Sequence, residues 1–274
     1  MSRVADLLFP PVCAGCGELT KIENFFGGKP DALCADCRRA WDEAKKEICG
    51  ICRRPVATCN CLTEEMERAR FSAFCKLVYY VPKNRDHVQN RAIYRIKDHA
   101  DAPITDFLAR ELCEPIRAAL RERKTAAGTP DARGDVFLVY LPRSRRAALE
   151  KGTDQARELA KALSEQLGLP LLPVIARRFG HGKAQKTLSP VERRRNANAA
   201  FRFRACADVK GKCALVVDDI VTGGASMSAA AKLLRRAGVR ELIAVAVASD
   251  ESNRMPPVGQ PTLRTEFDRL GRTH

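Results

Sequence analysis

The pattern of apolar and polar residues changes near residue 70. Beyond that point, five short segments are rich in valine, isoleucine, leucine and aromatic residues, a composition and spacing that predict β-strands. They cover residues 71–81, 136–142, 169–177, 212–219 and 241–249. Several of these segments are apolar almost throughout, which indicates strands whose two faces are both buried.

Helical periodicity fills most of the gaps between these segments. Three stretches carry apolar residues on one helical face and predict amphipathic helices. They cover residues 104–120, 153–168 and 226–238. In the second of them, Thr153 is a plausible N-cap and Gly168 a terminator. Residues 121–135 are rich in glycine, proline and charge and predict a surface loop.

Strands that alternate with helices predict an open parallel sheet with helices on both faces. In such sheets, ligands bind beyond the carboxyl ends of the strands. Asp218 and Asp219 lie at the expected end of a buried strand, and a loop with two glycines follows them. This end of the sheet is therefore the first candidate for a binding site.

The first 70 residues are dominated by cysteine instead. Eight of the twelve cysteines precede residue 62, in three Cys-x-x-Cys pairs and one Cys-x-Cys pair. Four thiolates bind Zn²⁺ tetrahedrally, so the pairs predict two zinc ribbons. The expected ligands are Cys13, Cys16, Cys34 and Cys37 for one ion, and Cys49, Cys52, Cys59 and Cys61 for the other. The spacing also permits interleaved ligation.

A disulfide framework is the alternative use for so many cysteines. It requires an oxidising compartment, whereas residues 1–13 lack the apolar core of a secretory signal. The expected location is the cytoplasm, and no apolar run reaches the length of a membrane span. Four thiolates leave no open coordination position, so the zinc is expected to be structural and to supply folding energy to a head with little core. Cys75, Cys113, Cys206 and Cys213 lack metal-like spacing and are expected to be buried.

Composition predicts where the domains begin and end, and charge indicates what kind of partner the protein binds. We predict a zinc-ribbon domain over residues 1–70, an α/β domain over residues 71–250 and a polar C-terminal extension over residues 251–274. The formal net charge is +15, which favours an anionic partner such as nucleic acid, a phosphorylated small molecule or a membrane surface. Solvated faces of helices and loops explain the arginine clusters equally well, so charge alone does not identify the anion.

The segment VVDDIVTGGASM, residues 216–227, has the chemistry of a ribose-phosphate site. A loop that enters a helix presents free backbone N–H groups and the positive end of the helix dipole. Gly223 and Gly224 would let this backbone approach a phosphate, and neighbouring hydroxyls add donors. Two carboxylates can accept hydrogen bonds from vicinal hydroxyls or hold water on Mg²⁺. The simpler alternative is that one aspartate caps the turn and the other faces solvent.

This segment resembles the phosphoribosyl-pyrophosphate (PRPP) motif of type I phosphoribosyltransferases. A cysteine-rich head followed by such a domain is similar to the ComF family of competence-associated proteins. The segments YLPRSRRAALEKGTDQARELA (residues 140–160) and AQKTLSPVERRRNANAAF (residues 184–201) also match that family. The resemblance covers residues 4–249 and implies a parallel-sheet, type I phosphoribosyltransferase-like α/β domain preceded by a small double zinc-ribbon domain.

The resemblance also implies roles for individual residues. Asp218 and Asp219 would hold the ribose hydroxyls and help to place Mg²⁺. The 5-phosphate would be bound by Thr222, Gly223, Gly224, Ala225 and Ser226. The pyrophosphate loop would be Pro142, Arg143 and Ser144. Residues 181–190 are polar and basic and are expected to form a lid.

Two positions depart from the family pattern. Residues 151–155 are Lys-Gly-Thr-Asp-Gln where the family usually has Arg-Gly-Phe-Asn-Gln, which puts a base-binding or transfer role of this loop in doubt. The phosphate loop has Thr-Gly-Gly where Thr-Thr-Gly is common. It loses one hydroxyl but keeps its backbone donors, so phosphate binding is expected to survive.

Two functional hypotheses remain. In the first, the protein binds PRPP or a related ribose phosphate with Mg²⁺ and acts in DNA uptake during natural transformation. Its zinc ribbons and arginines would contact single-stranded DNA or other DNA-uptake proteins. In the second, it is an active phosphoribosyltransferase that displaces pyrophosphate from PRPP in favour of a nucleobase or amine. No residue is assigned as the catalytic base. The few aromatic residues argue against base stacking along DNA.

Overall fold

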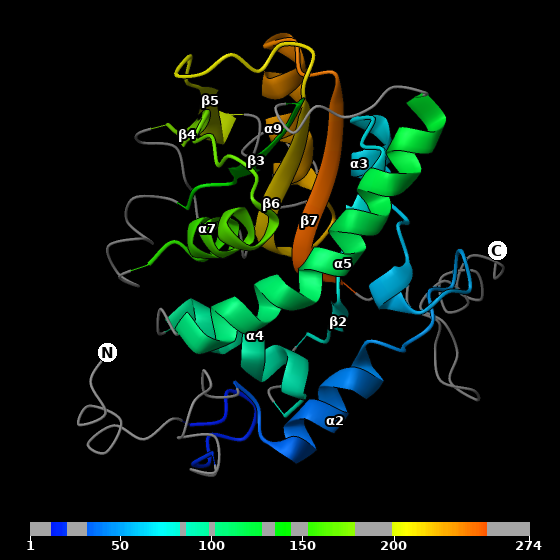
Figure 1. The fold of residues 1–274 in the computed structure, drawn as a ribbon, viewed down its shortest axis with the longest axis vertical. Helices are drawn as coiled ribbons and strands as arrows, with labels where there is room; N and C mark the ends of the chain where they lie inside the picture. The colour runs from blue at the N-terminus through cyan, green and yellow to red at the C-terminus, as the bar shows by residue number, and fades with distance from the viewer. Residues whose placement is uncertain are drawn as a thin grey trace, which may run out of the picture.

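The computed structural model describes residues 12–20, 32–82, 86–98, 102–127, 135–143, 153–178 and 199–250. At its centre is a five-stranded sheet in which every pair of strands is parallel (Figure 1). The strand order is β1-β7-β6-β3, and β2 also pairs with β7. The strands are β1 (Ala73–Cys75), β2 (Val78–Tyr80), β3 (Val136–Tyr140), β6 (Cys213–Val221) and β7 (Glu241–Asp250). The predicted α/β class with a parallel sheet is confirmed.

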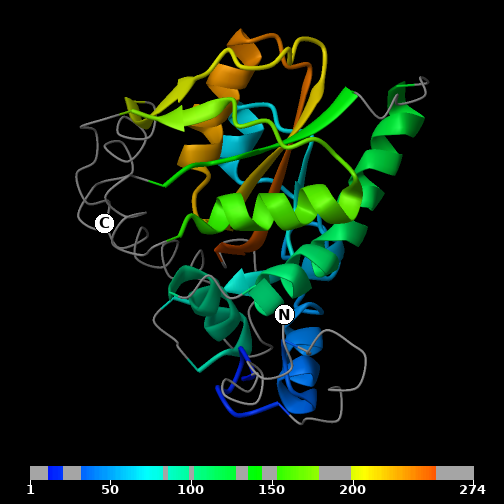
Figure 2. The same ribbon diagram turned by 60° about the vertical axis from the view of Figure 1, so that its left-hand side comes forward.

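Helices cover both faces of this sheet because the central strands are apolar on both sides. Successive residues of β6 enter different cores: Leu215 belongs to one and Val216 to the other. The first core includes residues of α4 (Val88–Asp98), α5 (Ala102–Ala127) and α7 (Gln155–Leu167). The second includes residues of α3 (Glu64–Arg68) and α9 (Ala225–Arg236). Figure 2 shows α7 crossing one face of the sheet.

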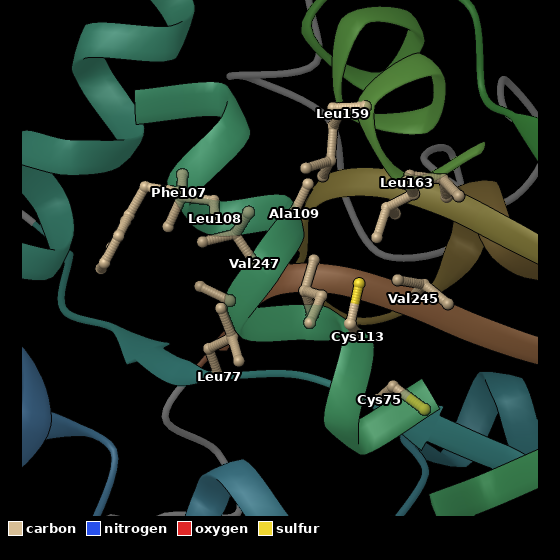
Figure 3. Packing of buried hydrophobic residues seen from close by; sticks show 14 of the residues in the cluster. Cys75, Leu77, Phe107, Leu108, Ala109, Cys113, Leu159, Leu163, Val245 and Val247 are labelled. Carbon is tan, nitrogen blue, oxygen red and sulfur yellow. The ribbon is translucent and has the colours of Figure 1, made fainter. Parts of the chain in front are cut away.

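The first core joins α5 and α7 to β7. Figure 3 shows Leu108 of α5, Leu163 of α7 and Val247 of β7 between the helices and the sheet, and all three side chains are fully buried. Removing a large aliphatic side chain from such a position typically costs about 2–5 kcal/mol. This packing holds α5 and α7 against the sheet.

A second, smaller sheet lies beyond the main one. It pairs β4 (Ile175–Arg177) with β5 (Phe201–Phe203) in antiparallel fashion (Figure 1). The prediction of one strand over residues 169–177 was therefore too long. Pro170 and Pro173 have no N–H to donate to a ladder, and this stretch makes only a single bridge, from Leu171 to β3, before β4 begins.

Other predicted boundaries shift by a few residues. The segment 71–81 forms two strands rather than one, because it breaks at Lys76, whose side chain is buried. The helix α5 continues to Ala127, into the predicted loop. At α7 the N-cap is Asp154 rather than Thr153, while Gly168 ends the helix in a left-handed conformation, as predicted. Within the described ranges, no helix combines the length and apolar character that a membrane span needs.

The N-terminal cysteine-rich region, here called the head, contacts α5 through an aromatic pair and a group of polar side chains. Its helix α2 (Ala35–Ala44) carries Trp41, which is fully buried and lies edge-on to Phe107 of α5, with ring centroids 5.6 Å apart. Glu111 of α5 accepts hydrogen bonds from the Trp41 indole (3.3 Å) and from Arg38 (3.1 Å), and it also pairs with Lys45. The head is therefore packed against the α/β domain rather than tethered to it.

Candidate functional sites

The eight cysteines of the head come together in two groups of four. In each group the Sγ atoms all lie within 4.8 Å of one another. The groups are Cys13, Cys16, Cys34 and Cys37, and Cys49, Cys52, Cys59 and Cys61. Zinc bound tetrahedrally at about 2.3 Å from each sulfur needs sulfurs about 3.8 Å apart, and the Cys16 and Cys34 sulfurs are 3.8 Å apart. The donor sets fit structural zinc, and ligands from the two groups do not interleave.

In the first group, backbone N–H donors surround the Cys13 sulfur. The Cys13 sulfur accepts hydrogen bonds from the backbone N–H groups of Gly15 (3.3 Å) and Cys34 (3.2 Å). Burial acts to raise the pKa of Cys13, but these bonds and one from Cys16 outweigh it and lower the pKa to about 7. A Cβ at Gly15 would lie 2.5 Å from the Cys37 sulfur, so the turn requires glycine here. The surroundings of Cys13 thus favour a thiolate, the form that binds zinc, whereas burial and the neighbouring thiols raise the pKa of Cys37.

The second group has a buried cation beside it. The Lys76 side chain is 2% exposed, and its ammonium donates to the carbonyl oxygens of Cys59 (2.9 Å) and Cys61 (3.2 Å). The same nitrogen is 3.5 Å from the Cys59 sulfur and 4.6 Å above the Phe74 ring. A buried ammonium is stable only with compensating negative charge, and a group of thiolates supplies it. Sequence reasoning missed this contact, because a lysine in an alternating strand is normally expected to face solvent.

The remaining cysteines differ in their burial. Cys75, Cys113 and Cys213 are buried, as expected, whereas Cys206 is exposed. Residue 206 lies in the irregular segment after β5, beyond the strand pair that would cover it. The expectation for Cys206 was therefore wrong.

The second candidate site lies where β3 and β6 end side by side. After β3, the Leu141 N–H still bonds to the Val217 carbonyl of β6 at 3.0 Å. Two residues on, the Arg143 guanidinium lies 3.4 Å from an Asp219 carboxylate oxygen, and both side chains are largely buried. The predicted pyrophosphate loop and the acidic pair are thus adjacent. Ser144 and the predicted lid, residues 181–190, lie outside the described residues.

The acidic pair is built into the strand rather than following it. The strand β6 continues to Val221, and Ile220 pairs with Ala248 of β7, so the predicted strand end at residue 219 was too early. Asp218 Oδ1 accepts the Asp219 N–H at 2.9 Å. Asp219 is held by Arg143 and is only partly exposed, which rules out the simpler alternative that it merely faces solvent.

Two further charged residues, not predicted from the sequence, face this pair. Arg177 of β4 reaches the Pro142 carbonyl at 3.5 Å and packs on the Phe201 ring. Burial lowers the pKa of Arg177, and the nearby charges of Asp218 and Asp154 oppose that shift. Asp154, the N-cap residue of α7, accepts the Arg143 N–H at 3.1 Å, which joins the start of α7 to the segment after β3.

This edge of the sheet, where β3 and β6 end, therefore carries both positively and negatively charged side chains that are partly buried. Burial raises the pKa of Asp154, although the Arg143 and Arg157 N–H groups and the Arg143 charge lower it, and Asp219 adds to the rise. The buried Oδ1 of Asp154 and Nε of Arg177 have no hydrogen-bond partner in the described part of the chain. Unsatisfied buried polar atoms of this kind are costly and often mark a ligand or water site.

The glycine loop has one open side and one closed side. A Cβ at Gly223 would meet no described atom within 4 Å, whereas Gly224 has a φ of +85° and faces Thr63 and Met66. Thr222 and Gly223 are exposed, and Ala225 begins α9. Backbone N–H groups at this helix start are available to an anion on the open side. Adjacent carboxylates with a nearby anion site suit hydrated Mg²⁺, so the donor set also fits that ion.

Comparison with known proteins identifies both parts of the chain. The family model for the double zinc ribbon domain matches residues 4–76, and the model for the phosphoribosyl transferase domain matches residues 153–264. Competence protein F of Haemophilus influenzae is 28% identical over 80% of this chain and 96% of its own length. Competence protein ComFC of Bacillus subtilis is 25% identical over 77% of this chain and 81% of its own. DNA utilization protein YhgH of Salmonella typhi is 30% identical over 53% of this chain and 60% of its own. The chain thus has a double zinc ribbon followed by a phosphoribosyl transferase-type domain, and over most of its length it is a homologue of competence protein F and competence protein ComFC.

Proposed function

We propose that the edge formed by β3, β6 and the glycine loop binds PRPP or a related phosphorylated ribose together with Mg²⁺. The observation that carries the proposal is the contact between Arg143 and Asp219, 3.4 Å apart at the ends of neighbouring strands. It supports one site in which an acidic pair and a cationic loop act on the same ligand. A phosphorylated ribose has matching parts, a diol for carboxylates and phosphates for cations.

Each part of such a ligand has a candidate partner. The carboxylates of Asp218 and Asp219 would accept hydrogen bonds from the ribose hydroxyls and hold hydrated Mg²⁺. The 5-phosphate would take the open side of the loop at Gly223, next to the start of α9. A pyrophosphate group would compete with Asp219 for Arg143, because charge-assisted bonds to phosphate are strong. Arg177, half-buried nearby, would add a second cation.

Calorimetric titration of the wild-type protein tests this proposal. We expect PRPP with Mg²⁺ to bind with a dissociation constant on the order of micromolar, and ribose 5-phosphate to bind more weakly because it lacks the pyrophosphate. Omitting Mg²⁺ should weaken PRPP binding by about tenfold. No chelator should be used, since it would also remove zinc. Absence of PRPP binding at millimolar concentration would refute the proposal.

The same sample separates binding from catalysis. If the protein is an active phosphoribosyltransferase, PRPP with a panel of nucleobases and amines releases pyrophosphate faster than PRPP alone. If it only binds, pyrophosphate release stays at the background rate with every acceptor. We expect the second result, because the Lys-Gly-Thr-Asp-Gln segment places Asp154 rather than a neutral side chain beside Arg143.

We also propose that the zinc ribbons contact single-stranded DNA. The names of the relatives, two competence proteins and a DNA utilization protein, support a role in competence. All the exposed large apolar residues of the described part of the chain lie in the two zinc-binding turns, and they are Val12, Leu19, Ile48 and Ile51. Arg53, also exposed, follows Ile51 by two residues in the sequence. Cationic side chains bind the phosphates of a single strand, and the exposed aliphatic side chains would lie against its bases.

Salt dependence of DNA binding checks this role. We expect the affinity for an oligonucleotide to fall steeply with salt, and Arg53→Ala to reduce the slope by about 0.7, the contribution of one phosphate contact on a single strand. The matched control is Arg121→Ala, which removes an exposed arginine of α5. Fluorescence anisotropy measures both. A flat salt response, or an equal effect of the two variants, would contradict a DNA role for the ribbons.

A further inference from the structure

The chain that leaves the second cysteine group runs directly to the glycine loop. Two residues after Cys61, the Thr63 hydroxyl donates to the Gly223 carbonyl at 3.3 Å. The short helix α3 follows and packs against α9, with Met66 fully buried in the second core. Residues 160 positions apart in the sequence are thus in contact at the candidate phosphate site.

This contact determines the shape of the closed side of the loop. A Cβ at Gly224 would lie 2.4 Å from the Thr63 hydroxyl oxygen and 3.1 Å from Met66 Cγ, so only glycine fits against them. Gly224 also has a φ of +85°, which other residues rarely adopt. The same residue is the N-cap of α9. The segment from Thr63 to Met66 therefore supports the backbone whose opposite side is open to a ligand.

The second cysteine group holds that segment in place. Lys76 binds the carbonyl oxygens of Cys59 and Cys61, and the Phe74 N–H bonds to the Asn60 carbonyl at 3.3 Å. These contacts join the chain between Cys59 and Cys61 to the edge of the sheet at β1. The Thr63 carbonyl then accepts the Met66 N–H at 2.9 Å and starts α3.

We propose that the second zinc ribbon is a positioning element of the phosphate loop, with Thr63 as the residue that transmits the position. The predicted effect on ligand affinity rests on the proposed function. The support that the ribbon gives to the loop does not depend on any ligand. Bound zinc would fix four cysteine sulfurs and hence the start of α3. Loss of this metal would release the loop, so occupancy of the ribbon and affinity for ribose phosphate rise and fall together.

Thr63→Val and Thr63→Ser form a matched pair for the test. Valine keeps the shape but removes the hydroxyl donor, whereas serine keeps the donor. The Ser228 N–H donates to the Gly224 carbonyl at 2.9 Å. We expect this amide to exchange hydrogen roughly tenfold faster in Thr63→Val than in the wild type, because local opening of the loop becomes easier. Ribose-phosphate affinity should fall by about fivefold. Thr63→Ser should match the wild type in both, and zinc content should be unchanged in both variants.

The outcomes separate this inference from the proposed function. Faster exchange in Thr63→Val in a protein that binds no ribose phosphate would support the inference and refute the function. Ligand binding with equal exchange and equal affinity in all three proteins would refute the inference and leave the function standing. Protection of the Ser228 amide that survives complete zinc removal by a chelator would also overturn the part assigned to the ribbon.

Discussion

Replacing Cys59 by serine is expected to remove one of the two zinc ions and to lower the melting temperature by roughly 10 °C. The reason is the buried Lys76 ammonium, which is 2% exposed and lies 3.5 Å from the Cys59 sulfur. Without the thiolate group, the ammonium would keep its burial but lose its compensating charge. Breaking a buried charge pair from one side costs about 3–5 kcal/mol, a large part of the stability of a typical domain.

Metal analysis and thermal unfolding measure this effect together. Cys206→Ser is the matched control, because Cys206 is an exposed cysteine outside both groups and should change neither zinc content nor melting temperature. A double variant, Cys59→Ser with Lys76→Met, should recover part of the loss, since it removes the uncompensated charge as well. Two bound zinc ions and an unchanged melting temperature in Cys59→Ser would contradict the assignment of the second group.

The large features of the fold were predictable because they depend on local sequence pattern. The apolar runs of β6 and β7 predict strands buried on both faces, and β6 supplies alternate residues to the two cores. Gly168 ends α7 because a left-handed residue is needed there and glycine adopts that conformation without strain. The two zinc groups were predictable for the same reason, since close cysteine pairs bring their own thiolates together.

The features that were missed depend on contacts between distant segments. Lys76 and Arg177 interrupt or end apolar runs, where a charged residue is normally expected to face solvent. Their burial follows from partners that the local sequence does not reveal, namely the Cys59 and Cys61 carbonyls for Lys76 and Pro142 and Phe201 for Arg177. The division at residue 70 stays a prediction.

Removing the charge of Asp218 and Asp219 is expected to change two affinities in different directions: the affinity for the complete ligand and the affinity for a free phosphate anion. Asp218 and Asp219 lie close to Arg143 and Arg177, so they lower the positive potential that a free phosphate meets. The same carboxylates are the proposed partners of the ribose diol and Mg²⁺. A variant without their charge should therefore lose affinity for the complete ligand and keep or gain affinity for an isolated anion.

The double variant Asp218→Asn/Asp219→Asn is accordingly expected to bind PRPP with Mg²⁺ at least roughly 100-fold more weakly. Two hydrogen bonds to charged groups, at about 1.5–3 kcal/mol each, account for a loss of this size. Affinity for inorganic pyrophosphate measured without Mg²⁺ should stay equal or increase, because Arg143 no longer has a carboxylate as its partner. Calorimetry measures both, with the exposed Asp208→Asn as a control that should leave both affinities unchanged. Equal PRPP affinity in the double variant and the wild type would rule out the acidic pair as the ribose and metal site. A parallel loss of affinity for PRPP and for pyrophosphate would indicate that the substitutions had disturbed the loop rather than the recognition of the diol.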